Sequence, residues 1–248
     1  MKKILSILLG LCSVSLYSWT ASPSIGGTTG LITTPTANVA WGKSSFGFNL
    51  GTHFIADKNN SITPKATIGI AGKAELGATY DIQDKESNDL LLHGKFRFHQ
   101  SGDTALAIGG NFQSINYGPN FNDTAGQIYL ATTYGASFFK MPSETTIVFG
   151  KTFAPGAESN IDFSMGFDLN LAPSVFKGYI HWLLDFANYS YSIDPRGAGA
   201  GRGIFNTGIR VAVLRDSPNM LLNLDLMILD ALDTNRSFGA GLAFGMAF

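Results

Sequence analysis

The feature that most constrains this chain is a two-residue alternation of apolar and polar side chains that recurs along its length. In residues 161–170, IDFSMGFDLN, an apolar side chain stands at every odd position and Asp, Ser, Gly, Asp or Asn at every even one. A strand places alternate side chains on opposite faces, whereas a helix scatters the two aspartates around its axis. Ten residues is also the length of a strand that crosses a bilayer. The stretch therefore predicts a strand with one apolar and one polar face.

Eleven further segments show the pattern with varying clarity, and together they predict an all-β chain of about twelve strands. They are residues 46–54, 66–70, 75–82, 90–99, 106–112, 128–134, 145–153, 177–189, 204–214, 219–230 and 237–248. Residues 145–153 do not reveal which alternate positions share a face. The leucines of the segment near 219–232 also fit a helix, but their alternation with Asn223 and Asp225 favours a strand.

The composition favours strands that face lipid. Only 14% of the residues are charged, and no run of 18 apolar residues follows residue 22. Without such a run, a chain crosses a bilayer only as a closed barrel that satisfies every backbone polar group. A secreted soluble β-sandwich is the alternative fold, but its outer face is normally charged, whereas the polar faces here hold many Gly, Ala, Ser and Asn residues. We expect a transmembrane, antiparallel, up-and-down β-barrel over residues 46–248.

The connections between the segments support an up-and-down order. Longer polar loops, expected on the outer side, alternate with short turns, expected in the periplasm, as in bacterial barrels. The outer loops fall at 56–61, 83–89, 114–123, 154–160, 190–202 and 232–236, and the inner turns at 71–73, 100–103, 140–144, 172–176 and 215–219. An even number of strands leaves both ends of the barrel in the periplasm.

The beginning of the chain predicts export. Lys2 and Lys3 precede an apolar run, residues 4–19, and small residues follow, so residues 1–21 are expected to be a cleaved signal peptide and the protein to reach the bacterial outer membrane. A retained membrane anchor is the alternative, but the run is short for one. The one cysteine, Cys12, lies in this segment, so the processed chain is expected to have no disulfides and no metal–thiolate sites.

The end of the chain predicts a closing strand. Residues 237–248, SFGAGLAFGMAF, alternate apolar and small side chains up to the last residue, and pairing with the first strand removes both free edges. The stretch resembles the C-terminal signal, ending in Phe, that the outer-membrane barrel assembly machinery reads; this implies that machinery and outer-membrane lipid as partners. The residues that carry the resemblance are Phe244, Met246 and Phe248. An ordinary half-buried edge strand is the alternative.

The polar faces predict the lining of the barrel lumen. The charged and histidine candidates are Glu75, Asp81, His93, Lys95, Arg97, Asp162, Asp168, Asp185, Arg210 and Asp225. Such charges either pair across a narrow interior and close it, or line water in a pore. Frequent inward glycines favour some free space. We therefore expect a narrow channel or passive transporter for small polar solutes, with a closed structural or assembly barrel as the alternative.

The chain shows no strong sign of catalysis. One stretch resembles the His-x-Ser and Asn pattern of outer-membrane phospholipases: His99, Gln100 and Ser101, followed by Asn111. These residues are expected at an inner turn and on the lumenal face, whereas a lipase needs its nucleophile and base on the membrane face near the outer leaflet. The four histidines show no metal-ligand spacing, and a net charge of -1 gives no reason to expect nucleic acid. We expect no enzyme, no cofactor and no metal site.

Residues 22–45 lie outside the strand pattern and are expected to be a periplasmic leader or a partial plug. Within them, Gly30, Leu31, Ile32, Pro35, Ala37 and Gly42 resemble the entry motif of YjbH-like outer-membrane proteins. The match covers about 25 residues. The resemblance implies β-barrel modules and an association with exopolysaccharide production, which would connect a closed barrel to surface polysaccharide export.

Overall fold

The computed structural model describes residues 22–57, 60–84, 88–116, 122–154, 161–187, 203–233 and 236–248. These residues form one antiparallel sheet and a single turn of helix, α2 (Pro173–Phe176). The strands are β1 (Phe46–Ala56), β2 (Ser61–Ile62), β3 (Lys65–Ile70), β4 (Ala74–Gln83), β5 (Asn88–Ser101), β6 (Thr104–Asn116), β7 (Asn122–Phe138), β8 (Met141–Phe153), β9 (Asp162–Asn170), β10 (Ile180–Ala187), β11 (Ile204–Ala212), β12 (Met220–Leu229) and β13 (Ser237–Ala247).

The sheet closes on itself. Each strand pairs with its neighbour in sequence, and β13 also pairs with β1. Both β2 and β3 pair with β1 and β4, so they occupy one strand position, interrupted around Pro64, which has no N–H to donate. The result is a barrel of twelve strand positions, which confirms the predicted fold and shows that the β-sandwich alternative is wrong.

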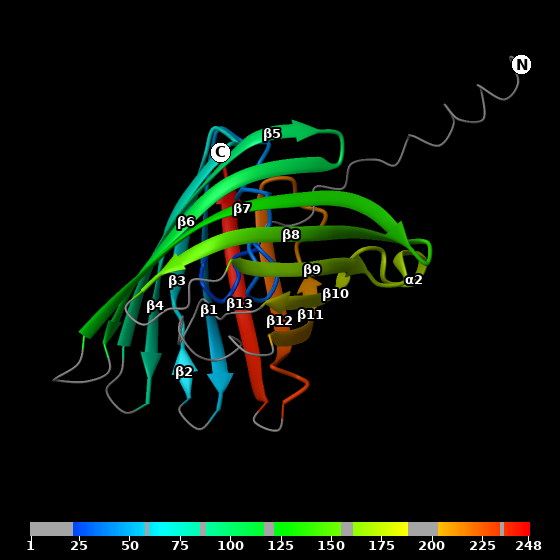
Figure 1. Ribbon diagram of the computed structural model, residues 1–248. Helices are drawn as coiled ribbons and strands as arrows, with labels where there is room; N and C mark the ends of the chain where they lie inside the picture. Colours follow the sequence, from blue (N-terminus) through cyan, green and yellow to red (C-terminus); the bar gives the residue numbers. More distant parts are fainter. Residues whose placement is uncertain are drawn as a thin grey trace, which may run out of the picture.

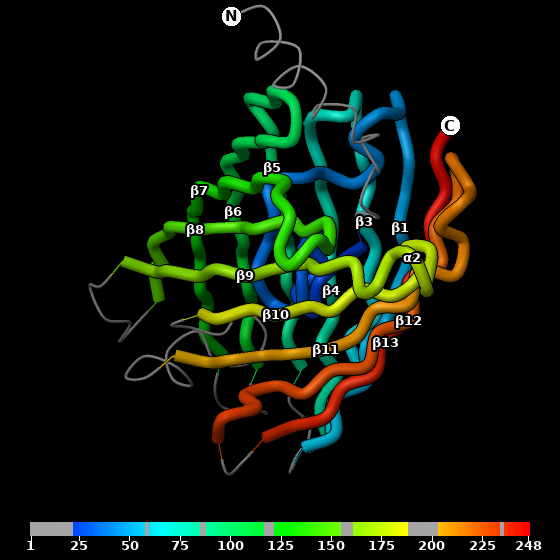
Figure 2. Tube along the Cα trace, turned by 90° about the vertical axis from the view of Figure 1, so that its right-hand side faces the viewer, coloured from blue at the N-terminus to red at the C-terminus, as the bar shows by residue number. Residues whose placement is uncertain are grey.

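The strands lean strongly against the barrel axis. In Figure 1, β1 and β13 run in a clearly different direction from β8 and β9, which lie farther around the ring. Such tilting is what closure of a sheet requires. Figures 1 and 2 both show the first described part of the chain, in dark blue, lying inside the ring of strands.

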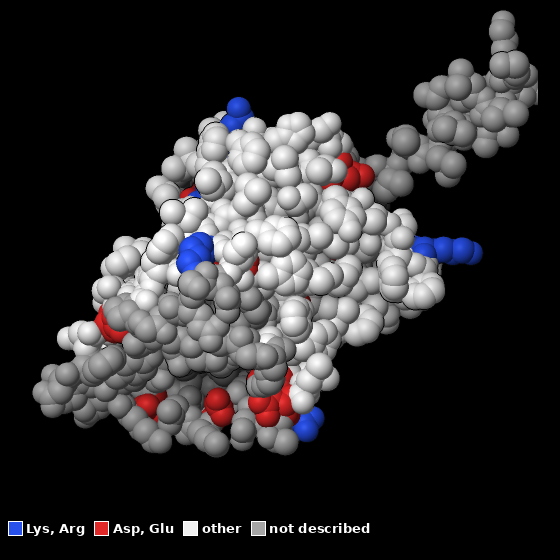
Figure 3. Space-filling model, viewed as in Figure 1, with Lys and Arg blue, Asp and Glu red and all other residues white. Residues whose placement is uncertain are grey.

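The two faces of the sheet differ as the alternation predicts. Large apolar side chains on the outer face are exposed; Leu76 is 53% exposed and Ile128 is 58% exposed. Their neighbours on the inner face are buried, including Glu75 and Tyr129. The view in Figure 3 shows an outer surface with few charged side chains across its middle and several acidic ones near one end. A belt of exposed apolar side chains around a closed sheet is the surface of a barrel in lipid.

In the part of the chain that the structure describes, no helix is both long and apolar enough to cross a membrane.

The closing seam joins the two ends of the barrel. Gly47 of β1 lies opposite Ala247 of β13, and the Phe248 N–H donates to the Phe46 carbonyl at 2.9 Å. On the outer face, the ring centroid of Phe248 lies 6.3 Å from those of Phe46 and Phe48. The predicted closing strand is therefore confirmed, with its aromatic side chains on the lipid side.

Two ambiguous segments are now assigned. Residues 220–229 form the strand β12, so the helical alternative is wrong. In β8, Val148 is buried inside the barrel and Phe149 is exposed outside it, which fixes the face of each alternate residue.

Three of the predicted inner turns differ in detail. In the predicted turn 100–103, Gln100 and Ser101 belong to β5. Residues 141–144 of the predicted turn 140–144 belong to β8, because Phe139 and Lys140, both with positive φ, make the reversal alone. The predicted turn 172–176 contains α2, which begins at Pro173, where a helix needs no N–H donor.

Parts of the predicted outer loops, and the predicted signal peptide with Cys12, lie outside the described residues.

Candidate functional site

The lumen contains a second layer of chain, residues 22–45, which we call the lumenal segment. Residues 22–40 are buried apart from the half-buried Gly26, Thr33 and Asn38. Two isolated bridges, Pro23 with Thr29 and Gly30 with Pro35, fold the segment back on itself. All the residues of the YjbH-like motif lie in this segment, so the structure places that motif inside the barrel.

All ten predicted lumenal residues lie on inward-facing positions, and all except the half-buried Arg97 are buried. Most of them contact the lumenal segment or one another rather than open space. Three main groups of contacts hold the segment, and single hydrogen bonds to Thr133 of β7 and Glu144 of β8 add to them.

The first group lies on β4 and β5. The Lys95 ammonium lies 3.1 Å from the Glu75 carboxylate, and both side chains are fully buried. Glu75 accepts hydrogen bonds from the N–H groups of Thr29 at 3.0 Å and Ala40 at 2.8 Å. Lys95 donates to the carbonyls of Thr29 and Thr36, each at 2.9 Å. The ion pair thus binds both N–H groups and carbonyl groups of the lumenal segment's backbone.

The second group lies on β10, β11 and β12. One oxygen of Asp185 accepts from the consecutive N–H groups of Ile32, Thr33 and Thr34, at 2.6–3.1 Å. Asn206 donates to the other oxygen at 2.7 Å. Hydrogen bonds to an ionised acceptor are about twice as strong as neutral ones, so Asp185 is a principal anchor.

Next to this anchor, Arg210 forms a two-pronged ion pair with Asp225, both contacts being 2.8 Å. It also donates to the carbonyls of Gly30 and Leu31. The carbonyl groups of residues 30–31 and the N–H groups of residues 32–34 are therefore bound by neighbouring strands of the wall.

The third group lies on β3 and β4. Lys65 donates to the carbonyls of Ser24 and Ile25 and lies 2.7 Å from the His53 ring. The hydroxyls of Thr67 and Thr79 donate to the carbonyls of Gly27 and Gly26. In all three groups, side chains of the wall bind the main chain of the segment.

Apolar contacts are confined to two small clusters. Ile25, Leu31 and Ile32 pack against wall residues Ile55, Leu183 and Met227. Ala37 packs against wall residues around Tyr129 and Val148. The interior is thus a mixture of hydrogen bonds, ion pairs and limited hydrophobic packing.

The room left by three inward glycines is filled by this segment. A Cβ at Gly69 would overlap the Ala40 carbonyl, and one at Gly47 would overlap the Trp41 ring. A Cβ at Gly166 would likewise overlap Leu31. The free space expected from these glycines is therefore occupied in this structure.

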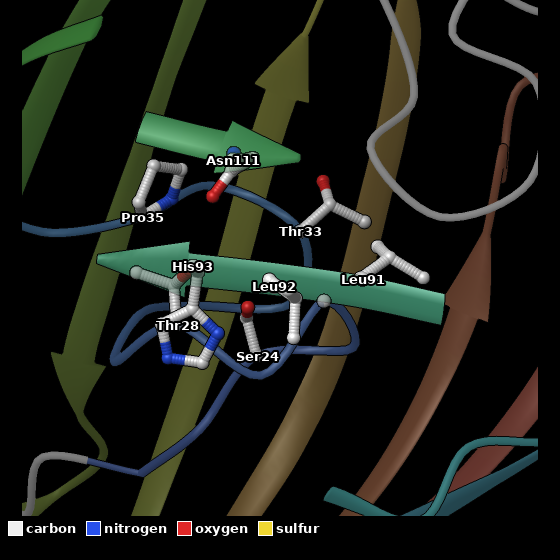
Figure 4. Close-up of a pocket in the computed structure, with 9 residues that line it drawn as sticks. Ser24, Thr28, Thr33, Pro35, Leu91, Leu92, His93 and Asn111 are labelled. Atoms are coloured by element: carbon white, nitrogen blue, oxygen red, sulfur yellow. The ribbon is translucent and has the colours of Figure 1, made fainter. Parts of the chain in front are cut away.

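A small uncharged cleft remains between the segment and β5 and β6 (Figure 4). Its enclosed volume is about 10 Å³, about the room that one water molecule needs, and the empty space that includes its open mouth is about 280 Å³. It is lined by Ser24, Gly26, Thr28, Thr33, Pro35, Leu91, Leu92, His93 and Asn111.

Four inward-facing charges of the wall were missed from the sequence, among them Asp123 of β7, which was expected in the outer loop 114–123. Lys65 was overlooked because its strand was read from Ala66, Ile68 and Ile70 alone. Asp89 lies on the inward positions of β5, in phase with His93, and is fully buried. Glu144 accepts from Asn38 at 3.0 Å and lies on β8, whose faces could not be assigned from its residues.

The phospholipase-like residues are not brought together. Register pairs His99 with Leu106 and Asn111 with His93, so His99 and Asn111 lie at different levels of the β5–β6 pair. Asn111 donates to Gln127 inside the barrel. Among the described residues, no group of three His, Cys, Asp or Glu side chains is arranged to hold a metal ion.

No protein-family model matches this chain, and no curated protein matches it. Solved structures do. A KdgM porin in complex with disordered oligogalacturonate has a TM-score of 0.56 at 8% identity, covering 81% of this chain and 99% of the other. The NanC porin has a TM-score of 0.53 at 8% identity, covering 81% of this chain and all of the other. At this identity the likeness concerns the fold alone: the chain folds as an outer-membrane β-barrel of twelve strands.

Proposed function

We propose that this protein is a channel of the bacterial outer membrane for small polar solutes, and that the lumenal segment is its movable plug. The observation that carries this proposal is that a charged wall holds the plug mainly through the plug's backbone. The fold shared with KdgM and NanC supports the same class of function. In this proposal the barrel transports its solute and performs no reaction on it.

The chemistry of the wall suits a lumen that opens. Asp185, Glu75 and Lys95 satisfy backbone groups of the segment when it is in place. Water can satisfy the same side chains once the segment leaves, because a protein hydrogen bond replaces one to water with a net gain of only about 0.5–1.5 kcal/mol. A permanently closed interior would be at least as stable with well-packed apolar side chains in place of buried ion pairs.

The route to the membrane belongs to the same proposal. Export through a signal peptide at residues 1–21 would deliver the chain to the periplasm. The closing strand would then present Phe244, Met246 and Phe248 to the barrel assembly machinery. All three lie on the outer face of the barrel, and Phe248 is 69% exposed.

A closed structural barrel is the second candidate, and the filled lumen favours it. In that case the YjbH-like motif connects the protein to surface exopolysaccharide export, and the lumenal segment is a permanent core. The two candidates differ in one measurable property, the passage of ions.

Single-channel recording in planar bilayers tests the proposal. Asp185→Ala removes the acceptor of three consecutive N–H groups, and a lost charge-assisted hydrogen bond costs about 1.5–3 kcal/mol. Because about 1.4 kcal/mol corresponds to a factor of ten in an equilibrium, we expect open probability to rise at least about tenfold over the unchanged chain. Asp216→Ala, at an exposed turn where Asp216 accepts from Tyr179, is the matched control and should leave it unchanged.

A disulfide lock provides the converse test. The Thr133 hydroxyl accepts from the Ala37 N–H at 2.8 Å, so cysteines at positions 37 and 133 should be near enough to bond. With no cysteine expected in the processed chain, this pair reacts alone. Oxidation should abolish openings and reduction restore them. If Asp185→Ala and the reduced pair never conduct, the channel is excluded and the closed barrel stands.

A further inference from the structure

The charges that face the lumen are strongly unbalanced. On inward-facing positions the described strands carry nine carboxylates but four Lys or Arg side chains. The carboxylates are Glu75, Asp81, Asp89, Asp123, Glu144, Asp162, Asp168, Asp185 and Asp225, and the cations are Lys65, Lys95, Arg97 and Arg210. Residues 22–42 of the lumenal segment contain no charged side chain, so the plug does not correct the imbalance.

The cations are already engaged. Lys95 pairs with Glu75, and Arg210 pairs with Asp225. Arg97 donates to the carbonyls of Gly42 and Gly72, and Lys65 to carbonyls of the plug. The excess negative charge is therefore carried by the inward-facing carboxylates other than Glu75 and Asp225.

Four inward-facing carboxylates lie on the neighbouring strands β8, β9 and β10. Register places Glu144 of β8 directly opposite Asp168 of β9, and Asp185 of β10 opposite Gly166, two residues from Asp168. Asp162 lies further along β9 on the same face. We call Glu144, Asp162, Asp168 and Asp185 the acidic wall.

Neutral groups satisfy most of the acidic wall in the plugged state. Glu144 accepts from Asn38 and Asp185 from the backbone of residues 32–34, all within the plug. Asp162 accepts from Gln127 and Thr152, and Asp168 contacts His181 at 2.7 Å. Among the ion pairs of the described residues, none brings a Lys or Arg to these four carboxylates.

A second observation points to a ligand at this wall. The Ser164 hydroxyl lies on the inward face of β9 between Asp162 and Asp168, on a residue that is 1% exposed, and it has no hydrogen-bond partner. A buried hydroxyl without a partner is costly, and here it adds a neutral oxygen on the inward face of β9, two residues from Asp162. Carboxylates and hydroxyl oxygens are groups that solvate a small cation or accept from a protonated amine.

We propose that the acidic wall selects cations, so that the solutes of this channel are small inorganic cations and protonated amines. This inference rests on the proposed channel function. When the plug moves, Glu144 and Asp185 lose the donors that it supplies, and four carboxylates face the opened path. A lumen lined by one sign of charge raises the local concentration of the opposite ion.

The reversal potential of single openings tests the inference. With a tenfold KCl gradient across the bilayer, the unchanged full-length chain should pass K⁺ over Cl⁻ by at least about fivefold, as expected of charge focusing in a narrow path. Glu144→Gln and Asp162→Asn should each lower this ratio, and the pair of changes should bring it close to unity. Asp216→Asn, at an exposed turn, removes the same charge outside the lumen and should leave the ratio unchanged.

Each result decides the matter. A ratio near unity or a preference for Cl⁻ in the unchanged chain overturns cation selection and leaves the channel intact. An equal fall in the Asp216→Asn control shows that general charge, not the acidic wall, sets the preference, which also overturns the inference. A barrel that passes no current overturns the proposed channel and this inference together.

Discussion

Glu75 and Lys95 are the most completely buried ion pair among the described residues, with neither side chain exposed. Removing two charges from water is expensive, and such a pair is retained only when further hydrogen bonds satisfy both groups. Here the backbone of the lumenal segment supplies those bonds at Thr29, Thr36 and Ala40. The pair and the segment therefore stabilise each other, and neither is complete alone.

Neutralising one member of this pair should destabilise the protein more than neutralising both. Glu75→Gln leaves the Lys95 charge buried without its counter-ion, and Lys95→Gln does the same to Glu75, so each should cost about 3–5 kcal/mol of unfolding free energy. The double change removes both charges and keeps hydrogen-bonding amides, so its cost should be below that of either single change. Urea unfolding in detergent micelles, followed by tryptophan fluorescence, measures all three. Strictly additive losses would show that the two groups do not act as a pair.

At the scale of elements, the strands could be predicted from the sequence and the lumenal segment could not. Lipid on one side and a polar interior on the other impose a period of two on every strand, which is why residues 161–170 and 237–248 were assigned from their letters alone. The contacts of the segment obey no period. Asp185 meets Ile32 across 153 positions, and the groups that it binds are backbone N–H groups that every residue but proline carries.

The lumenal residues show the same limit. Alternation placed Glu75, Asp185 and Arg210 on the inner face, where the structure has them. The alternation does not reveal that the hydrogen-bond partner of these side chains is the backbone of the lumenal segment instead of water. Glu144 was missed because residues 140–144 were expected to form an inner turn, and the residues of the following strand do not show which of its faces is polar.

The closing strand should depend on its last ring. Phe248→Ala keeps the N–H bond to Phe46 but removes the contacts with the rings of Phe46 and Phe48, a loss of about 1–2 kcal/mol. If the assembly machinery reads this end, the amount of folded barrel in outer membranes should fall several-fold more than that loss explains. Phe238→Ala, at the opposite end of β13 and 57% exposed, is the matched control. Equal yields of the two variants in membranes would contradict a C-terminal signal.

At the scale of the whole molecule, stability comes from closure. Every strand of the ring has two hydrogen-bonded neighbours, including β1 and β13, so no edge is left for another chain to pair with. Local opening must break bonds to both neighbours at once. The lumenal segment adds contacts to this ring but takes no part in its closure, because the β-bridges that it forms join its own residues to one another.

The ring should therefore survive sodium dodecyl sulfate without heating, and it should do so whether or not the plug is anchored. An unboiled sample is expected to migrate faster than a boiled one, since the closed barrel stays compact while the unfolded chain extends. Asp185→Ala weakens the plug but leaves the strand pairs intact, so its unboiled band should match that of the unchanged chain. The belt of exposed side chains such as Leu76 and Ile128 requires detergent or lipid throughout. One band position for boiled and unboiled protein, together with recovery from an aqueous fraction without detergent, would show that protein rather than lipid covers this belt, and the barrel in membrane would have to be abandoned.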